Sequence, residues 1–319
     1  MTASIARLFF ALLLCGCAAT QKKIVIPDVP APPIGKDTLL GDCDGNPIAY
    51  QARDSRQAGA EIRCTRRIGD IAGLLGSLDA QSTLLVLDID DTLLTSDTFF
   101  GSDAWYEWQR DAGIPAAARP MCKFDIIALN YEAGTQHAVE GQAGVDLING
   151  LDLPKLLLTS RSAHYRGGTE RELLNARYQL PRNLLRAEKK LPGDHGISWT
   201  APDKRGNPTP ISYAHGILMV TGADKGDRLV ELLHYAGLHY KHIVLVDDGI
   251  DNINSLSAAV PATGAHYYGF WYRKVDKSPK PGDEAAAIQA LSAWQNLVQT
   301  HYPNRARRWS MPGEQGCGK

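Results

Sequence analysis

Short, continuous runs of apolar residues recur along this chain, and segments with helical spacing separate most of them. The apolar runs cover residues 83–87, 155–158, 217–220, 242–246 and 265–272. Runs of this length suit strands that are buried on both faces. Helical patterns cover residues 169–178, 227–236 and 252–259. Because strands that alternate with helices form parallel sheets, the sequence predicts an α/β fold with a doubly wound, Rossmann-like parallel sheet.

Two longer stretches interrupt this alternation. The first, at about residues 95–152, follows the first predicted strand and contains Trp105, Tyr106 and Trp108. The second, at about residues 187–214, is rich in Pro, Gly and Asp and predicts a loop or hairpin. Long insertions after parallel strands lie at the carboxyl edge of a sheet, where ligands bind. We therefore expect a cap inserted after the first strand, whose aromatic residues form either its core or a platform for substrate.

Amphipathic helices are predicted on both sides of this region. Residues 67–78 carry apolar side chains at helical spacing before the first strand. A C-terminal helix is indicated by Ile288, Leu291, Trp294 and Val298. The chain has 319 residues, of which 44% are hydrophobic, so it can bury a sizeable core as one large domain or two.

The N-terminus has the features of an export signal. A basic Arg7 precedes a short apolar run at residues 8–14, which cannot span a bilayer. The sequence Leu14-Cys15-Gly16-Cys17 that follows resembles a bacterial lipobox, so Cys17 would carry a lipid after cleavage behind Gly16. An ordinary secretory signal is the alternative. Ala18 at the next position favours anchoring to the outer membrane, facing the periplasm, and the proline-rich residues 18–36 predict an extended tether.

Charge and cysteine usage exclude several classes of protein. With 34 Lys and Arg against 35 Asp and Glu, the chain lacks the basic excess of a nucleic-acid binder, and we expect no nucleic-acid partner. The cysteines beyond the signal contain no CxxC pair, which argues against a zinc ribbon or a thioredoxin-like site. These cysteines are Cys43, Cys64, Cys122 and Cys317. They allow three disulfide pairings; Cys43 with Cys64 is favoured because both precede the predicted sheet.

Polar side chains follow the predicted strands at the point where each strand ends. Asp88 and Asp90 follow the first strand, and Thr159 and Arg161 end the second. Lys225 precedes a predicted helix. The fourth strand is followed by Asp247, Asp248, Asp251 and Asn252. Because parallel strands end at the same edge of a sheet, we expect these side chains to converge there.

At these positions the chain resembles the haloacid dehalogenase superfamily of phosphohydrolases, whose four motifs it matches in order over roughly residues 80–275. The motifs are Asp88-Ile89-Asp90-Asp91-Thr92, Thr159, Lys225, and Asp247-Asp248 with Asp251 or Asn252. Within the superfamily it is most similar to secreted or lipid-anchored bacterial acid phosphatases. It also resembles a poorly characterised bacterial family in which DIDDTL precedes a GSD-aromatic stretch, here residues 101–105. The implied organisation is a signal peptide (1–17), a tether (18–36) and a phosphohydrolase domain (37–319) with its cap at about 95–152.

The resemblance implies roles for the first motif. Asp88 would attack phosphorus and form an aspartyl-phosphate. Asp90 would protonate the leaving oxygen and then activate water, while its backbone carbonyl binds the metal. Mg²⁺ would bridge the carboxylates and the phosphate, with Asp247 as a further ligand. Thr92 would stabilise the turn.

The later motifs would hold the substrate and support the metal. Thr159 and Lys225 would bind phosphoryl oxygens, and Arg161 could reach the phosphate. Asp248, together with Asp251 or Asn252, would orient water and ligands around the metal.

The implied function is Mg²⁺-dependent hydrolysis of a small-molecule phosphomonoester at the bacterial cell envelope. Phosphotransfer to another acceptor, or a catalytically silent binding or scaffold role, are the alternatives.

Overall fold

The computed structural model describes residues 43, 59–182, 184–185 and 196–309. The predicted signal peptide with Cys17, the tether and Cys317 lie outside the described residues. Within the described ranges no helix is long and apolar enough to cross a membrane.

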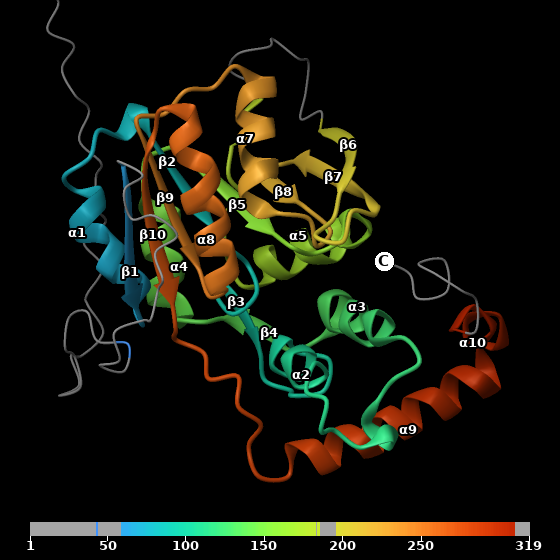
Figure 1. Ribbon diagram of the computed structural model, residues 1–319. Coiled ribbons are helices and arrows are strands. Elements are labelled where there is room, and N and C mark those ends of the chain that lie inside the picture. The colour runs from blue at the N-terminus through green and yellow to red at the C-terminus, as the bar shows by residue number, and fades with distance from the viewer. Residues whose placement is uncertain (1–42, 44–58, 183, 186–195, 310–319) are drawn as a thin grey trace, which may run out of the picture.

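A twisted sheet of eight strands forms the centre of the molecule (Figure 1). Its order is β1-β10-β9-β2-β5-β8-β7-β6, and the strands from β1 to β8 pair in parallel. The strands are β1 (Ala60–Thr65), β2 (Thr83–Leu87), β5 (Lys155–Thr159), β6 (Ile197–Pro202), β7 (Pro208–Ala214), β8 (Ile217–Met219), β9 (His242–Asp247) and β10 (His266–Tyr272). Helices cover both faces, so the predicted Rossmann-like α/β fold is confirmed.

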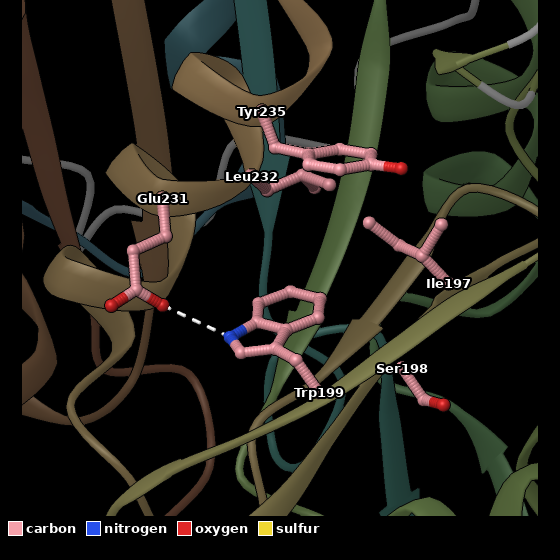
Figure 2. Close-up of a pocket in the computed structure, with 6 residues that line it drawn as sticks. All are labelled: Ile197, Ser198, Trp199, Glu231, Leu232 and Tyr235. Atoms are coloured by element: carbon pink, nitrogen blue, oxygen red, sulfur yellow. Dashed lines mark hydrogen bonds between the residues drawn. The ribbon is translucent and has the colours of Figure 1, made fainter.

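The edge of the sheet beyond β8 is an antiparallel hairpin formed by β7 and β6. This hairpin agrees with the loop or hairpin predicted at about residues 187–214. Between β6 and helix α7 (Lys225–Ala236) lies a pocket of about 480 Å³ (Figure 2). In this view Trp199 of β6 faces the helix, and its indole Nε1 donates to Glu231 Oε2 over 3.0 Å.

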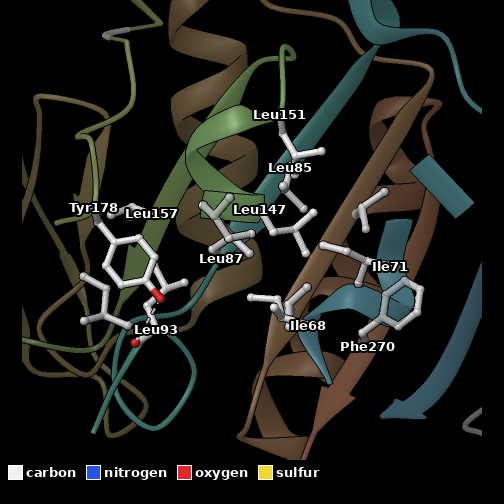
Figure 3. Close-up of a cluster of buried hydrophobic side chains, with 14 of the residues drawn as sticks. Ile68, Ile71, Leu85, Leu87, Leu93, Leu147, Leu151, Leu157, Tyr178 and Phe270 are labelled. Atoms are coloured by element: carbon white, nitrogen blue, oxygen red, sulfur yellow. Dashed lines mark hydrogen bonds between the residues drawn. The ribbon is translucent and has the colours of Figure 1, made fainter. Parts of the chain in front are cut away.

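The core occupies both faces of the sheet, which explains the continuous apolar runs. Along β2, Leu85 and Leu87 belong to one hydrophobic cluster, whereas Leu84 and Val86 belong to the cluster on the opposite face. The first cluster, shown in Figure 3, packs against α1 (Ile71–Leu75), α4 (Gly141–Gly150) and α5 (Arg166–Asn175). The second packs against α7 and α8 (Ile250–Ala259).

A cap projects from the carboxyl edge of the sheet (Figure 1). Its stem is a short antiparallel pair, β3 (Leu94–Ser96) and β4 (Gln136–Ala138), and it contains α2 (Asp103–Trp108) and α3 (Lys123–Ala133). Helix α9 (Asp283–His301) supplies Ala287 and Leu291 to the same hydrophobic cluster as Trp105, Trp108 and Ile126. We use "the cap" for residues 97–135 together with α9. Trp105 and Trp108 are therefore part of the cap core.

The boundaries of two predicted segments differ in the structure. The insertion predicted to end at about residue 152 includes α4, but Val145 and Ile148 of that helix are buried in the core of the sheet. This helix therefore belongs to the α/β layer, and the cap ends before β4. The helix predicted at residues 67–78 is shorter, because α1 covers only Ile71–Leu75 after a 3-10 turn and contains Gly73. Glycine weakens a helix interior.

Disulfides and a C-terminal helix attach the ends of the described chain. Cys43 and Cys64 form a disulfide, which confirms the favoured pairing and ties residue 43 to β1. Cys122 is also disulfide-bonded and lies against Trp309 of α10 (Pro303–Trp309). Arg305 of the same helix forms an ion pair with Asp125 of α3. Helix α10 is thus attached to the cap.

Candidate active site

The central strands β2 and β9 deliver two carboxylates to the same point. Leu87 pairs with Val246 in the parallel register, so the next residues, Asp88 and Asp247, lie side by side. The Asp88 backbone N–H donates to the Val246 carbonyl over 3.0 Å, which continues the pairing beyond the last strand residue. Both aspartates are buried.

Lys225 joins these two carboxylates. Its Nζ lies 2.7 Å from Asp88 Oδ1 and 2.7 Å from Asp247 Oδ2, and its side chain is 1% exposed. Lys225 is the first residue of α7, and the Asp224 side chain caps that helix by accepting from the Asp227 N–H. Burial, together with the nearby charge of Asp247, raises the pKa of Asp88 to about 7 despite the opposing charge of Lys225.

The turn after β9 orients the other oxygen of Asp247. Oδ1 accepts hydrogen bonds from the Gly249 N–H at 2.8 Å and from Asn252 Nδ2 at 2.9 Å. A side chain at Gly249 would clash, since its Cβ would lie 2.8 Å from Asn252 Nδ2. Of the two alternative residues, Asn252 therefore reaches the site, whereas Asp251 is exposed on the first turn of α8.

Asp90 is held by Arg161 in a two-pronged ion pair. Nε lies 3.0 Å from Oδ2 and Nη2 lies 2.8 Å from Oδ1. The Arg161 guanidinium is fully buried and stacks 3.8 Å from the ring centre of Tyr131 in the cap. It also donates to Thr169 and Gln136. Arg161, expected to reach a substrate phosphate, thus binds the second carboxylate of the first motif.

Thr159 lies at the same edge, at the end of β5. Its side chain is fully buried, and its Oγ1 accepts from the Arg161 backbone N–H at 3.1 Å. This hydrogen bond shapes the loop that presents Arg161 to Asp90. The order Thr159-Ser160-Arg161 therefore allows the threonine side chain to hold the loop from which Arg161 binds Asp90.

The turn after β2 requires an unusual backbone conformation. Asp91 has a φ of 53°, in the left-handed region that Asp tolerates better than most residues. Its Oδ1 accepts from Thr95 Oγ1 at 2.7 Å. Thr92 is buried, and its hydroxyl has no hydrogen-bond partner in the described part of the chain. The side-chain hydrogen bond that stabilises this turn therefore comes from Thr95.

Lys277 is a site residue that sequence reasoning missed. It lies in the segment between β10 and α9, and its Nζ lies 2.5 Å from Asp248 Oδ2 and 3.5 Å from Asp91 Oδ2. It also forms an ion pair with Asp103, the first residue of α2. The only sequence signal was Asp103, in the GSD stretch, since nothing around residue 277 suggests chemistry.

The acidic residues at this edge exceed the basic ones. The carboxylates are Asp88, Asp90, Asp91, Asp103, Asp247 and Asp248, and the cations are Lys225, Arg161 and Lys277. Burial raises the pKa of Asp91 to about 6 and that of Asp248 well above its usual value. Asp88, Asp247 and Asp248 offer oxygens within 4.8 Å of one another and could hold a metal ion. Such an all-oxygen donor set suits a hard divalent cation, which would balance the surplus charge.

The pocket of Figure 2 is separate from this edge. Its lining residues on α7, such as Glu231 and Tyr235, follow Lys225 by about one and a half to three turns. At about 1.5 Å per residue, Tyr235 lies on the order of 15 Å along the helix from the site. Glu231 is already engaged by Trp199 and Arg228.

The fold and the site together define a Rossmann-like α/β protein with a cap and a buried acidic cluster able to hold a metal ion. The chain belongs to a family described as "Protein of unknown function (DUF2608)", whose profile matches residues 65–304. That match includes the cap, the whole acidic cluster and every strand of the sheet except β1, of which it reaches only the last residue. No curated protein and no solved structure matches the chain.

Proposed function

We propose that this protein is a Mg²⁺-dependent phosphomonoester hydrolase of the haloacid dehalogenase type. The observation that carries the proposal is the buried triad in which Lys225 lies between Asp88 and Asp247. In this triad Asp88 can act as a nucleophile. Positive charge at the same point comes from the Lys225 ammonium group and from a metal ion that the two carboxylates could bind. Hydrolysis of a phosphate dianion by a carboxylate needs this combination.

Asp88 would act as the nucleophile. Its oxygen attacks phosphorus, the bond to the leaving oxygen breaks, and an aspartyl-phosphate forms. Lys225 neutralises charge on the phosphoryl oxygens and keeps the Asp88 side chain in place. Water then attacks the aspartyl-phosphate, which releases inorganic phosphate and restores the carboxylate. Mg²⁺, when bound through Asp88, the Asp90 carbonyl and Asp247, would polarise the phosphate and reduce its repulsion from the nucleophile.

Asp90 would move the protons. In the first step it would donate a proton to the leaving oxygen, and in the second it would take one from the attacking water. Its side chain is 19% exposed, so substrate and water can approach it. Arg161 is a positioning residue in this scheme, because its planar fork holds both oxygens of Asp90. A residue that activates water favours hydrolysis over transfer to another acceptor.

The proposal extends to the cell envelope. A lipid on Cys17 would anchor the protein, with its domain facing the periplasm from the outer membrane. The Cys43–Cys64 disulfide supports an oxidising compartment, because disulfides rarely persist in a reducing cytosol. The substrate would be a small phosphomonoester, whose identity depends on the cap.

The test is a panel of phosphomonoesters given to the purified full-length chain with Mg²⁺ or with EDTA. We expect turnover that EDTA abolishes and added Mg²⁺ restores. Asp88→Asn should remove activity, whereas Asp251→Asn, which changes an exposed carboxylate of the same region, should not. Full activity in excess EDTA would contradict the metal-dependent scheme. No turnover of any substrate with Mg²⁺ present would favour the silent binding role.

A further inference from the structure

Lys277 occupies the centre of a second acidic cluster. Three carboxylates from three segments meet at its ammonium group: Asp91 after β2, Asp248 after β9 and Asp103 in the cap. The side chains of Asp91 and Asp248 are largely buried, and Lys277 itself is 28% exposed. The positive charge at the centre of this cluster is therefore supplied by the protein itself, through the Lys277 ammonium group.

The same three carboxylates have the arrangement of a metal site. Their oxygens lie within 4.8 Å of one another, as do those of Asp88, Asp247 and Asp248. Asp248 is common to both groups. Two ions that share a carboxylate, typically about 3.5–4 Å apart, are the usual geometry of two-metal hydrolases.

One oxygen of the second cluster is poorly satisfied by the protein. Asp91 Oδ2 is buried and has no hydrogen-bond partner within the ranges that the structure describes. Its nearest positive charge is Lys277 Nζ at 3.5 Å, while the other oxygen is engaged by Thr95. Burying a carboxylate oxygen without a hydrogen bond costs free energy, so a cation at this point would stabilise the site.

We propose that Lys277 is a resident cation that fills a second metal site, so that the catalytic edge takes one divalent ion instead of two. Removing the ammonium group would leave Asp91, Asp103 and Asp248 free to bind a second divalent ion. The proposal rests on the proposed function only in assigning the first ion to Asp88 and Asp247. Lys277 is a positioning residue, since it holds Asp248 toward the second cluster and ties Asp103 of the cap to the sheet.

The experiment counts bound Mn²⁺, which takes the same oxygen ligands as Mg²⁺. The full-length chain is titrated with Mn²⁺, and free Mn²⁺ is measured by electron paramagnetic resonance. We expect one bound ion per chain for the wild type, two for Lys277→Met, and one for Lys277→Arg, which keeps the charge. Adding Asp103→Asn to Lys277→Met should return the count to one.

Each outcome decides the proposal. Two ions in the wild type would overturn it, and so would a count in Lys277→Met that does not exceed the wild-type count. A second ion that persists when Asp103→Asn is added would place that ion elsewhere and also refute it. If Lys277→Met does not fold, the wild-type count and the Lys277→Arg count still test the claim. No ion in the wild type but one in Lys277→Met would refute the metal-dependent function and leave the role of Lys277 standing.

Discussion

Replacing Lys225 with methionine tests the buried triad by a route that needs no substrate. The change removes the cation that Asp88 and Asp247 share and keeps a side chain of similar length. Both carboxylates are buried, so the folded variant must hold two uncompensated acidic groups. Breaking a buried ion pair in this way costs about 3–5 kcal/mol of unfolding free energy. We expect a loss of that size for Lys225→Met near pH 8.

The loss of unfolding free energy in Lys225→Met should be smaller at acidic pH, and the direction of this change follows from the pKa of Asp88. Burial raises the pKa of Asp88 to about 7 with Lys225 present, and Lys225 opposes that rise. The variant therefore has a still higher folded pKa, against an unfolded value near 4. A raised pKa favours folding below the unfolded value, and this contribution disappears as the pH rises through the folded value. Near pH 5 the carboxyl group is protonated in both folded proteins, whereas at about pH 8 it is ionised in the wild type and held protonated, at a cost, in the variant. Because pH 8 lies only about one unit above the wild-type value, the loss near pH 5 should be smaller than that near pH 8 by roughly 1 kcal/mol.

Urea unfolding, followed by circular dichroism in EDTA, measures both free energies. Lys241→Met is the control, because Lys241 is exposed and precedes β9, the strand that carries Asp247. It should cost less than about 0.5 kcal/mol at either pH. Equal losses for Lys225→Met at both pH values, or a loss under about 1 kcal/mol near pH 8, would refute the argument.

The remaining predictions concern the reaction and the anchor. Asp88→Asn should abolish any covalent phosphoenzyme, whereas Asp90→Asn should slow turnover by about 10²–10⁴-fold and accumulate the intermediate with an aryl phosphate. Mass spectrometry would then find a phosphoryl group on the peptide containing Asp88, and an adduct elsewhere would exclude Asp88 as the nucleophile. Arg161→Lys loses the fork that holds Asp90, so kcat should fall by up to about 10²-fold with little change in KM; an unchanged kcat would remove Arg161 from its positioning role. Cys17→Ala should release the protein from membranes or block its processing, while Cys15→Ala should not. An unchanged membrane fraction in Cys17→Ala would favour ordinary secretion.

The sheet could be predicted because its central strands are buried on both faces. The run at β2 is apolar throughout, since alternate residues enter two different cores. Strand β1 was missed because it lies at the edge and exposes Glu61 and Arg63, which breaks the apolar pattern. The positions of the site residues followed from a general rule, that parallel strands end at a common edge.

Which side chains contact one another at the site could not be predicted from the sequence. Arg161 binds Asp90 across 71 positions of the chain, and Lys277 binds Asp103 across 174. No local pattern specifies such contacts. The first joins the ends of the neighbouring strands β2 and β5, and the second depends on where the cap lies against the sheet. The C-terminal helix shows the same limit: its apolar stripe was predicted from Leu291 and its neighbours, but its packing into the cap was not.

Because the cap is assembled from two distant stretches of the chain, its core is complete only when the C-terminal part has packed against it. Helices α2 and α3 emerge early, whereas α9, which covers Trp105 and Ile126, begins only at residue 283. The sheet can form before then, but the site cannot be enclosed. A chain that ends or is cleaved before α9 would expose these apolar side chains as a hydrophobic patch, which chaperones and proteases recognise.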